Sequence, residues 1–274
     1  MDRSEFSPYA LASEEVAREF LLRAGASEPE LVDWLPIMVN KATDAAEAFC
    51  GRRLAARTYR RTVTLSCTTT LDDETVAGSG FTLQVKALDD VAGPGIRPGT
   101  RVASLTSASS LELSKKATAA GTADLVFGST PLLERGDGSA SIHLHESPIA
   151  SLADIYSVKR HDLAGVLTAI DLADAEIYGD GAPGLARLEI ASGVFGDGSR
   201  YEIECKAGYD VTTWSGRQQL EWAVLRMVQI LWQDLMKSPG RTGDINLIQA
   251  TQRFASFRIP DDIRADLVSY RRIG

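Results

Sequence analysis

The chain has 274 residues, of which 44% are apolar, and its 37 acidic and 29 basic residues give a formal net charge of -8. This composition indicates folded domains with apolar cores and excludes a protein that coats nucleic acid through a basic surface. Cys50, Cys67 and Cys205 lie far apart without CxxC spacing, which excludes a disulfide framework and a zinc cluster. The sequence MDRSEFSPYA lacks the apolar core of a signal peptide, and no apolar run is long enough to span a bilayer. We therefore expect a protein that is made and kept in the cytosol, or in a particle assembled there.

Two helices are predicted before residue 50. The first begins after the N-cap Ser13, presents a short apolar face and ends before Gly25. The second has apolar residues at spacings of three and four between Leu31 and Phe49. Pro36 interrupts that pattern, so we expect a kink or a late helix start there.

Five arginines fall within the segment CGRRLAARTYRR at residues 50–61, which is unexpected in an acidic chain. At the end of the second helix, arginines are stabilised by the helix dipole and by the last free carbonyls, which is a purely structural explanation. The alternatives are salt bridges to an acidic neighbouring subunit and contacts with phosphate. Overall acidity favours the neighbour over phosphate. The candidates for a subunit interface are Arg52, Arg53, Arg57 and Arg60.

A β region begins after Arg57. Residues 58–65 alternate as a strand does, and residues 81–85, 101–105, 111–113 and 125–127 are further strand candidates with glycine and proline turns between them. This spacing predicts a small sandwich or barrel. We assign residues 66–135 to an inserted, sandwich-like all-β domain, with 1–65 and 136–274 forming the remaining core.

Strand patterns continue at 141–145, 149–158, 185–190 and 201–206 and give way to a long helix from Arg217 to about Lys237. Its apolar stripe is wide enough to need partners on more than one side. Residues 238–256 are polar, and the sequence leaves open whether they are ordered before assembly. A last helix follows Ile259-Pro260, with acids at its start and arginines at its end, as the helix dipole prefers.

Two motifs suggest metal ions but are explained better without them. His143 and His145 lie on one face of a predicted strand, a spacing that metal sites use, yet no third ligand is near in the sequence. The tripeptide GDG occurs at 136–138, 179–181 and 196–198, where hairpin turns are the better interpretation than calcium loops. Nucleotide-binding and catalytic motifs are missing from the sequence, so we predict no enzyme, cofactor or metal.

Several segments, taken in order, resemble the head-tail connector, or adaptor, proteins of tailed bacteriophages. They are AAEAFCGRRLAARTYR, GDGSASIHLHESPIASLADIYS, YEIECKAGYD, QLEWAVLRMVQILWQD and IPDDIRADLVSYRR. The resemblance covers roughly residues 10–63 and 136–274. Residues 66–135 make this chain longer than many such adaptors, and they look like β modules that recur in phage virion and tail proteins.

The resemblance implies an α+β fold in which a helical bundle of the adaptor type carries β-strands, here with the inserted β domain. It implies a structural virion protein, assembled in the host bacterial cytoplasm, that forms a ring, commonly of twelve copies, beneath the portal protein at the neck. Such a ring passes genomic DNA to a downstream tail or stopper protein without sequence-specific binding, and it uses no catalytic residue and no membrane. By position, the residues expected to dock on the portal are Phe257, Ile259, Ile263, Leu267, Tyr270, Arg271 and Arg272. The alternative is another neck, tail-completion or fibre-attachment module that binds a virion protein through its β domain.

Overall fold

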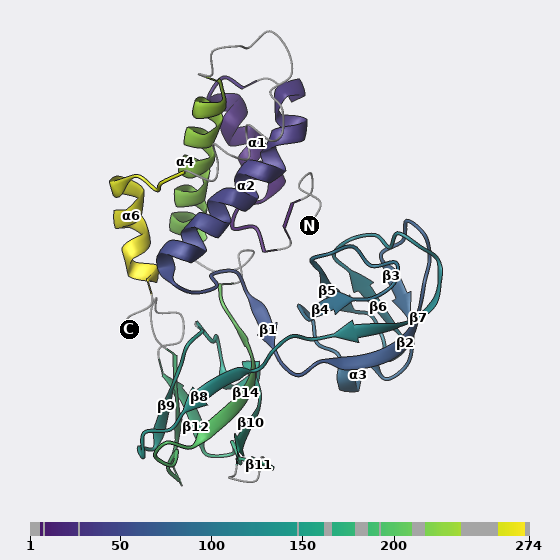
Figure 1. Ribbon diagram of the computed structural model, residues 1–274, viewed down its shortest axis with the longest axis vertical. Helices are drawn as coiled ribbons and strands as arrows, with labels where there is room; N and C mark the ends of the chain where they lie inside the picture. The colour runs from purple at the N-terminus through teal and green to yellow at the C-terminus, as the bar shows by residue number, and fades with distance from the viewer. Residues whose placement is uncertain are drawn as a thin grey trace. The chain divides into compact units, whose positions relative to one another are not determined.

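The computed structural model describes residues 6–7, 9–26, 28–146, 148–161, 166–178, 186–191, 193–209, 217–236 and 257–271. The chain divides into two compact units (Figure 1). One contains residues 56–209, and the other joins residues 2–55 to residues 210–272. None of the helices in these described residues has the length and apolarity needed to cross a bilayer.

The helical unit is built from both ends of the chain. Its elements are α1 (Glu14–Arg23), α2 (Glu28–Cys50), α4 (Arg217–Met236), α6 (Asp261–Leu267) and the 3-10 turn η2 (Val268–Tyr270). The Ser13 hydroxyl accepts a hydrogen bond from Val16 N and caps α1, as predicted. α2 continues through Pro36 from Glu28, so the late start expected at the proline is not found.

The wide apolar face of α4 is covered within the chain. α4 packs against α1, α2 and α6, and its predicted apolar stripe is buried at Leu220, Val224, Met227, Leu231 and Leu235. Trp222 remains 52% exposed and meets Phe20 edge to face. The helix therefore needs no second copy of the chain to shield its apolar face.

Two antiparallel sheets enclose one core in the other unit. The first has the order β1 (Arg57–Tyr59), β14 (Arg200–Ala207), β10 (Ile155–His161) and β11 (Leu167–Ala169), and β8 (Leu132–Arg135) also pairs with β14. The second has the order β12 (Ala175–Tyr178), β13 (Ala186–Ile190) and β9 (Ser141–Leu144). Alternation along β14 turns Tyr201, Ile203 and Cys205 toward the shared core. The 3-10 turn η1 (Leu152–Asp154) precedes β10.

Six strands of the same unit close into a barrel with a core of its own. In barrel order they are β2 (Val63–Thr69), β3 (Thr75–Ala77), β6 (Ser110–Leu113), β5 (Thr100–Leu105), β4 (Asp90–Ala92) and β7 (Gly121–Phe127). Closure leaves this sheet without a free edge, unlike the sandwich predicted for this region. The segments on either side of the barrel lie together, because Ser129 donates from its N–H to Arg60 O (2.9 Å) and from its hydroxyl to Thr58 O (2.8 Å).

The strand predicted at residues 81–85 is a short helix, α3 (Phe81–Gln84). Gly80 precedes it with a φ of 77°, a left-handed conformation that glycine adopts without steric cost. Phe81 is fully buried and meets Phe127 edge to face at 6.0 Å, whereas Leu83 is 85% exposed. The sequence FTLQV alternates apolar and polar residues as a strand does, but in the structure only Phe81 and Val85, four residues apart, are buried.

The predicted fold class is wrong. The described residues contain two open sheets and a closed six-stranded barrel, and the long helices lie in a unit formed by the chain ends rather than in a bundle that carries β elements. The error arose because the long amphipathic helices give strong periodic signals, while strands of three to eight residues give weak ones.

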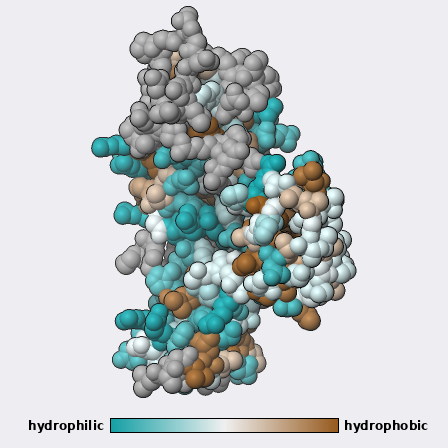
Figure 2. Space-filling view, turned by 45° about the vertical axis from the view of Figure 1, so that its right-hand side comes forward, coloured by the Kyte–Doolittle hydropathy of each residue, from teal (hydrophilic) through white to brown (hydrophobic). Residues whose placement is uncertain are grey.

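On the face seen in Figure 2, exposed apolar residues form small separate patches.

Candidate functional site

The arginines of the 52–61 segment are engaged inside the chain, beginning at the end of α2. Arg52 is 5% exposed and donates from Nε to Tyr270 O at 2.8 Å. Arg53 meets Glu47 at 2.9 Å, and the buried Glu47 also accepts from Leu54 N at 2.9 Å. The Arg52 contact ties the end of α2 to the C-terminal 3-10 turn, and the Glu47 contacts hold the residues that follow α2.

Asp89 forms a second anchor, between β1 and the barrel. Its fully buried carboxylate accepts from Thr58 Oγ1 (2.9 Å), Arg60 NH1 (2.8 Å) and Lys86 N (2.8 Å). Burial raises the pKa of Asp89, against the opposing effect of these donors. A carboxylate with three donors at this position fixes the segment that leads into the barrel.

Glu202 forms a third anchor on β14. Arg61 binds it with two hydrogen bonds, Nε to Oε1 at 2.5 Å and NH2 to Oε2 at 2.7 Å. This bidentate pair lowers the pKa of Glu202. Lys159 and His161 lie nearby on β10 and lower it further.

The structure therefore does not bring the four predicted interface arginines together as one patch. Arg52 and Arg53 belong to the helical unit, whereas Arg57 and Arg60 belong to the β unit. Arg57 is half-buried at the start of β1. A role for these residues between subunits stays a prediction.

The C-terminal segment predicted to dock on a portal is mostly packed into its own unit. Ile259, Ile263, Leu267 and Tyr270 are buried, with at most 8% exposure. Arg271 is exposed and stacks over the Phe49 ring, and Phe257 is half-buried. Arg272 lies outside the described residues. The exposed side of the helix in this segment includes Asp261, Asp262, Arg264, Asp266 and Val268.

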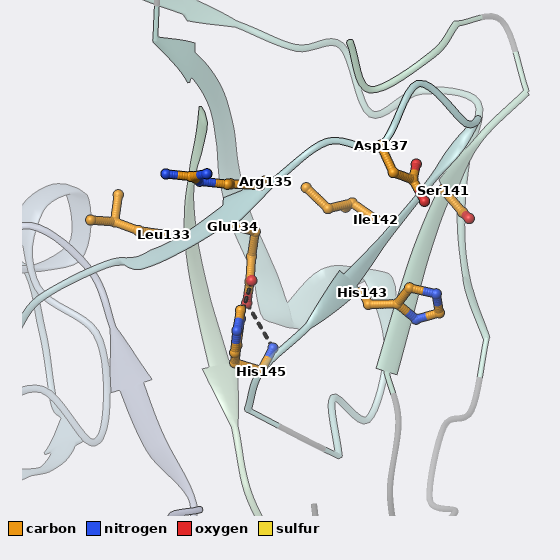
Figure 3. Close-up of a pocket in the computed structure, with 8 residues that line it drawn as sticks. All are labelled: Leu133, Glu134, Arg135, Asp137, Ser141, Ile142, His143 and His145. Atoms are coloured by element: carbon orange, nitrogen blue, oxygen red, sulfur yellow. Dashed lines mark hydrogen bonds and ion pairs between the residues drawn. The ribbon is translucent and has the colours of Figure 1, made fainter. Parts of the chain in front are cut away.

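Both strand histidines line a pocket of about 460 Å³ between β8 and β9 (Figure 3). Its other lining residues are Leu133, Glu134, Arg135, Asp137, Ser141 and Ile142. Glu134 is 2% exposed and contacts His145 twice, through the imidazole Nδ1 and through a hydrogen bond from His145 N at 2.7 Å. Figure 3 shows that His143 points away from this pair.

The described residues contain no group of three or more histidine, cysteine, aspartate or glutamate side chains arranged to hold a metal ion. Asp137 instead accepts a hydrogen bond from Ser139 N at 3.0 Å, and its pKa is lowered by its bonds to Ser139. This is the geometry of a turn that an aspartate stabilises locally.

Two of the GDG tripeptides lie next to each other at one end of the sandwich that the two open sheets form around their shared core. Gly136 N donates to Ser199 O at 3.0 Å, Gly198 N donates to Gly136 O at 3.0 Å, and Gly138 N donates to Phe195 O at 2.8 Å. Each tripeptide connects strands of different sheets, so neither is a hairpin turn between paired strands. The GDG at 179–181 lies outside the described residues.

Comparison with known proteins identifies no family for the chain. No protein-family model and no curated protein matches the chain. A chain from a solved structure described as the virion of a native gene transfer agent particle is 20% identical over 46% of this chain and 70% of that one, with a TM-score of 0.26. A likeness at that level supports no conclusion about fold or function.

Sequence reasoning singled out the arginines but missed their partners. Glu47, Asp89 and Glu202 are almost fully buried, and each neutralises an arginine. In the sequence they are three of 37 acidic residues. The one available signal was the alternation in YEIECKA, which places Glu202 and Glu204 on the opposite face from the core residues of β14.

Proposed function

We propose that this chain is a structural protein of a tailed-phage-like virion, namely a head-tail adaptor that forms a ring of about twelve copies beneath the portal. In this proposal the helical unit and the two open sheets form the adaptor core, and barrel strands β2 to β7 form the inserted domain; the bounds differ from the predicted 66–135 because β2 begins at Val63 and β8 (Leu132–Arg135) belongs to the first sheet. The ring continues the DNA channel toward a tail or stopper protein and catalyses no reaction.

The observation that carries the proposal is the meeting of three resemblance segments in one sheet. The RTY segment forms β1, ADIYS leads into β10, and YEIECKA forms β14. β14 pairs with both, through Tyr59↔Cys205 and Ile155↔Cys205 among other pairs. Segments about 145 residues apart therefore form one structural element, while the residues between β1 and β8 leave that sheet to close a barrel.

The acidic net charge of the chain also agrees with a channel through which DNA passes. Each phosphate that a protein neutralises adds affinity for DNA, so a channel that lets DNA slide should lack a continuous basic wall. A net charge of -8 agrees with that requirement, although it does not locate the charges on a channel wall. Closed rings use head-to-tail contacts, in which unlike surfaces of identical copies meet.

Native mass spectrometry and negative-stain imaging of the purified protein test the proposal. We expect rings at raised concentration, with a mass of about 354 kDa for twelve copies of 29.5 kDa. A chain that stays monomeric at every concentration, also beside a portal protein, contradicts it.

A second candidate, a neck, tail-completion or fibre-attachment module, is favoured by one observation. The barrel has its own core, made of residues such as Phe81, Val102 and Phe127, separate from the sandwich core. Such a module would remain monomeric and would bind a tail component through the barrel surface. Loss of that binding on changing exposed barrel residues, without any ring, would favour this candidate.

A further inference from the structure

Two arginines lie directly opposite each other on the outer face of the first sheet. On β14 the core residues are Tyr201 and Ile203, so Arg200 and Glu202 point to the other face. Strand pairing places Arg135 of β8 and His161 of β10 on either side of Arg200. We call Arg135, Arg200 and His161 the arginine row.

Within the arginine row, His161 Nε2 lies 3.8 Å from Glu202 Oε2, but the two arginines are not neutralised by their neighbours in the described residues. Like charges directly opposite on paired strands destabilise a sheet. Glu202 is bound by Arg61, and Glu204 accepts from Ser157 Oγ at 2.9 Å and lies 3.9 Å from Lys159 Nζ. Neither Arg135 nor Arg200 takes part in the ion pairs found among the described residues.

An exposed apolar side chain lies beside the row. Leu133 is two residues before Arg135, is opposite Glu202 and is 47% exposed. Figure 3 shows Leu133 and Arg135 pointing to a different side of β8 from the Glu134 carboxylate, and both also line the edge of the pocket. A partner for this surface therefore needs carboxylates together with an apolar group.

The turn between β2 and β3 has that chemistry. Residues 71–74 read Leu-Asp-Asp-Glu, and all four are exposed, with Leu71 at 55%. We call them the acidic turn. Asp73 accepts from Thr75 N at 3.0 Å, and hydrogen bonds to Thr75 lower its pKa, while Lys116 supplies one nearby positive charge. Asp72 N donates to Ala117 O at 3.0 Å, which holds the turn backbone in place.

We propose that the acidic turn of one copy docks on the arginine row of the next copy, with Leu71 against Leu133. Arginine and leucine on one surface match carboxylates and leucine on the other. Because the two surfaces differ, repetition of the contact runs head to tail and closes into a ring when the rotation allows. Duplex DNA is the weaker candidate partner, since phosphate makes no use of an exposed leucine and the chain is acidic overall. This contact rests on the proposed ring, which it would help to build.

Charge reversal tests the contact. The row variant is Arg200→Glu, and the turn variant is Glu74→Lys with Asp73→Asn, in which the amide oxygen can still accept from Thr75 N. Association is measured by sedimentation velocity and native mass spectrometry at about 50 mM salt, where screening is weak. We expect each variant to associate at least about tenfold more weakly, because each sets like charges against each other.

The combined variant, carrying both changes in one chain, should restore association to within about threefold of the original, because opposite charges face each other again. Arg187→Glu on the second sheet is the matched control and should leave association unchanged. Circular dichroism and thermal melting establish that every variant is folded.

The outcomes distinguish a failure of the proposed contact from a failure of the proposed ring. Rings that form equally well in both variants overturn this contact and leave the proposed function intact. A parent protein that never associates overturns both. Association that weakens in either variant but is not recovered in the combined variant also overturns the contact. If Arg200→Glu instead abolishes binding of a duplex DNA oligonucleotide while rings persist, the row serves phosphate and the proposal is wrong.

Discussion

At the scale of single residues, buried carboxylates fix the positions of three arginine side chains through ion pairs. Arg53, Arg60 and Arg61 each pair with an acid that is at most 5% exposed, namely Glu47, Asp89 and Glu202. Removing one member of a buried ion pair leaves an uncompensated charge, which costs more than the net contribution of the intact pair. Arg53 and Arg61 are about half exposed whereas their acids are buried, so losing the arginine, which leaves a buried carboxylate unpaired, should cost more than losing the acid.

Asp89→Ala should destabilise the protein by about 3 kcal/mol, because Arg60, Thr58 and Lys86 N lose their shared acceptor. Asp89→Asn should cost less, since the amide oxygen still accepts and burial disfavours the charged carboxylate. Urea unfolding measures both. Asp124→Ala, at an exposed position, is the control and should change stability by less than about 0.5 kcal/mol. Equal effects at residues 89 and 124 would contradict the anchor role.

The Glu202 pair predicts a pH dependence. Because Arg61 lowers the pKa of Glu202 below its ordinary 4.5, the ionised pair stabilises the fold above that value. This contribution is lost as pH falls through the lowered folded pKa. Glu202→Gln should therefore cost about 1 kcal/mol at pH 7 and progressively less in acid, as followed by urea unfolding over a pH series. A gap that is constant with pH would contradict this assignment.

At the scale of elements, the paired GDG loops join the two sheets at one end of the sandwich. A Cβ on Gly136 would lie 2.5 Å from Gly196 O and 2.7 Å from Phe195 O, both backbone atoms that cannot rotate away. Gly136→Ala should therefore destabilise the protein by about 2 kcal/mol in urea unfolding. Gly193→Ala is the matched control, because its Cβ meets the mobile end of the Ile190 side chain at 3.2 Å. A harmless Gly136→Ala would show that the loops separate easily.

The elements also show what the sequence could predict. α1, α2, α4 and α6 were expected close to their observed positions, because caps and apolar periodicity act locally. The strand expected at 58–65 is two strands, β1 and β2, in different sheets. Its alternation is continuous in the sequence, and the point where the chain leaves one sheet for the next is marked only by tertiary contacts, such as those of Asp89 and Ser129 with this segment. Barrel closure likewise depends on pairings between strands distant in sequence, which no local pattern contains.

At the scale of the whole molecule, the free cysteines allow the unfolding of the helical unit and that of the barrel to be measured separately. Cys50 is buried in the helical unit and Cys67 in the barrel core, and burial raises the pKa of each thiol to about 11. Neither should react with a thiol reagent at pH 8 while the protein is folded, because the thiolate is scarce and covered. Pulsed labelling in increasing urea, read by mass spectrometry, should give separate midpoints for the two thiols, because they lie in units with separate cores. A single shared midpoint would show that the units unfold together.

The candidate surfaces were less predictable than the helices. The sequence indicated an arginine cluster and a C-terminal docking segment, but Arg52 and Ile263 turn out to be buried within the chain. The arginine row was invisible because Arg135, His161 and Arg200 meet only through the register of β8, β10 and β14. Surface function of this kind depends on strand pairing, which is a property of the assembled sheet.

The hydrogen bonds from Ser129 to Arg60 and Thr58 bring the two ends of the barrel segment side by side. A gene encoding this chain can therefore lose or exchange the barrel in one recombination event, because a few linking residues would rejoin the neighbouring ends. Relatives that differ in length at this point would keep the sheet that contains β1 and β14 and would carry a different inserted domain, or none, between β1 and β8.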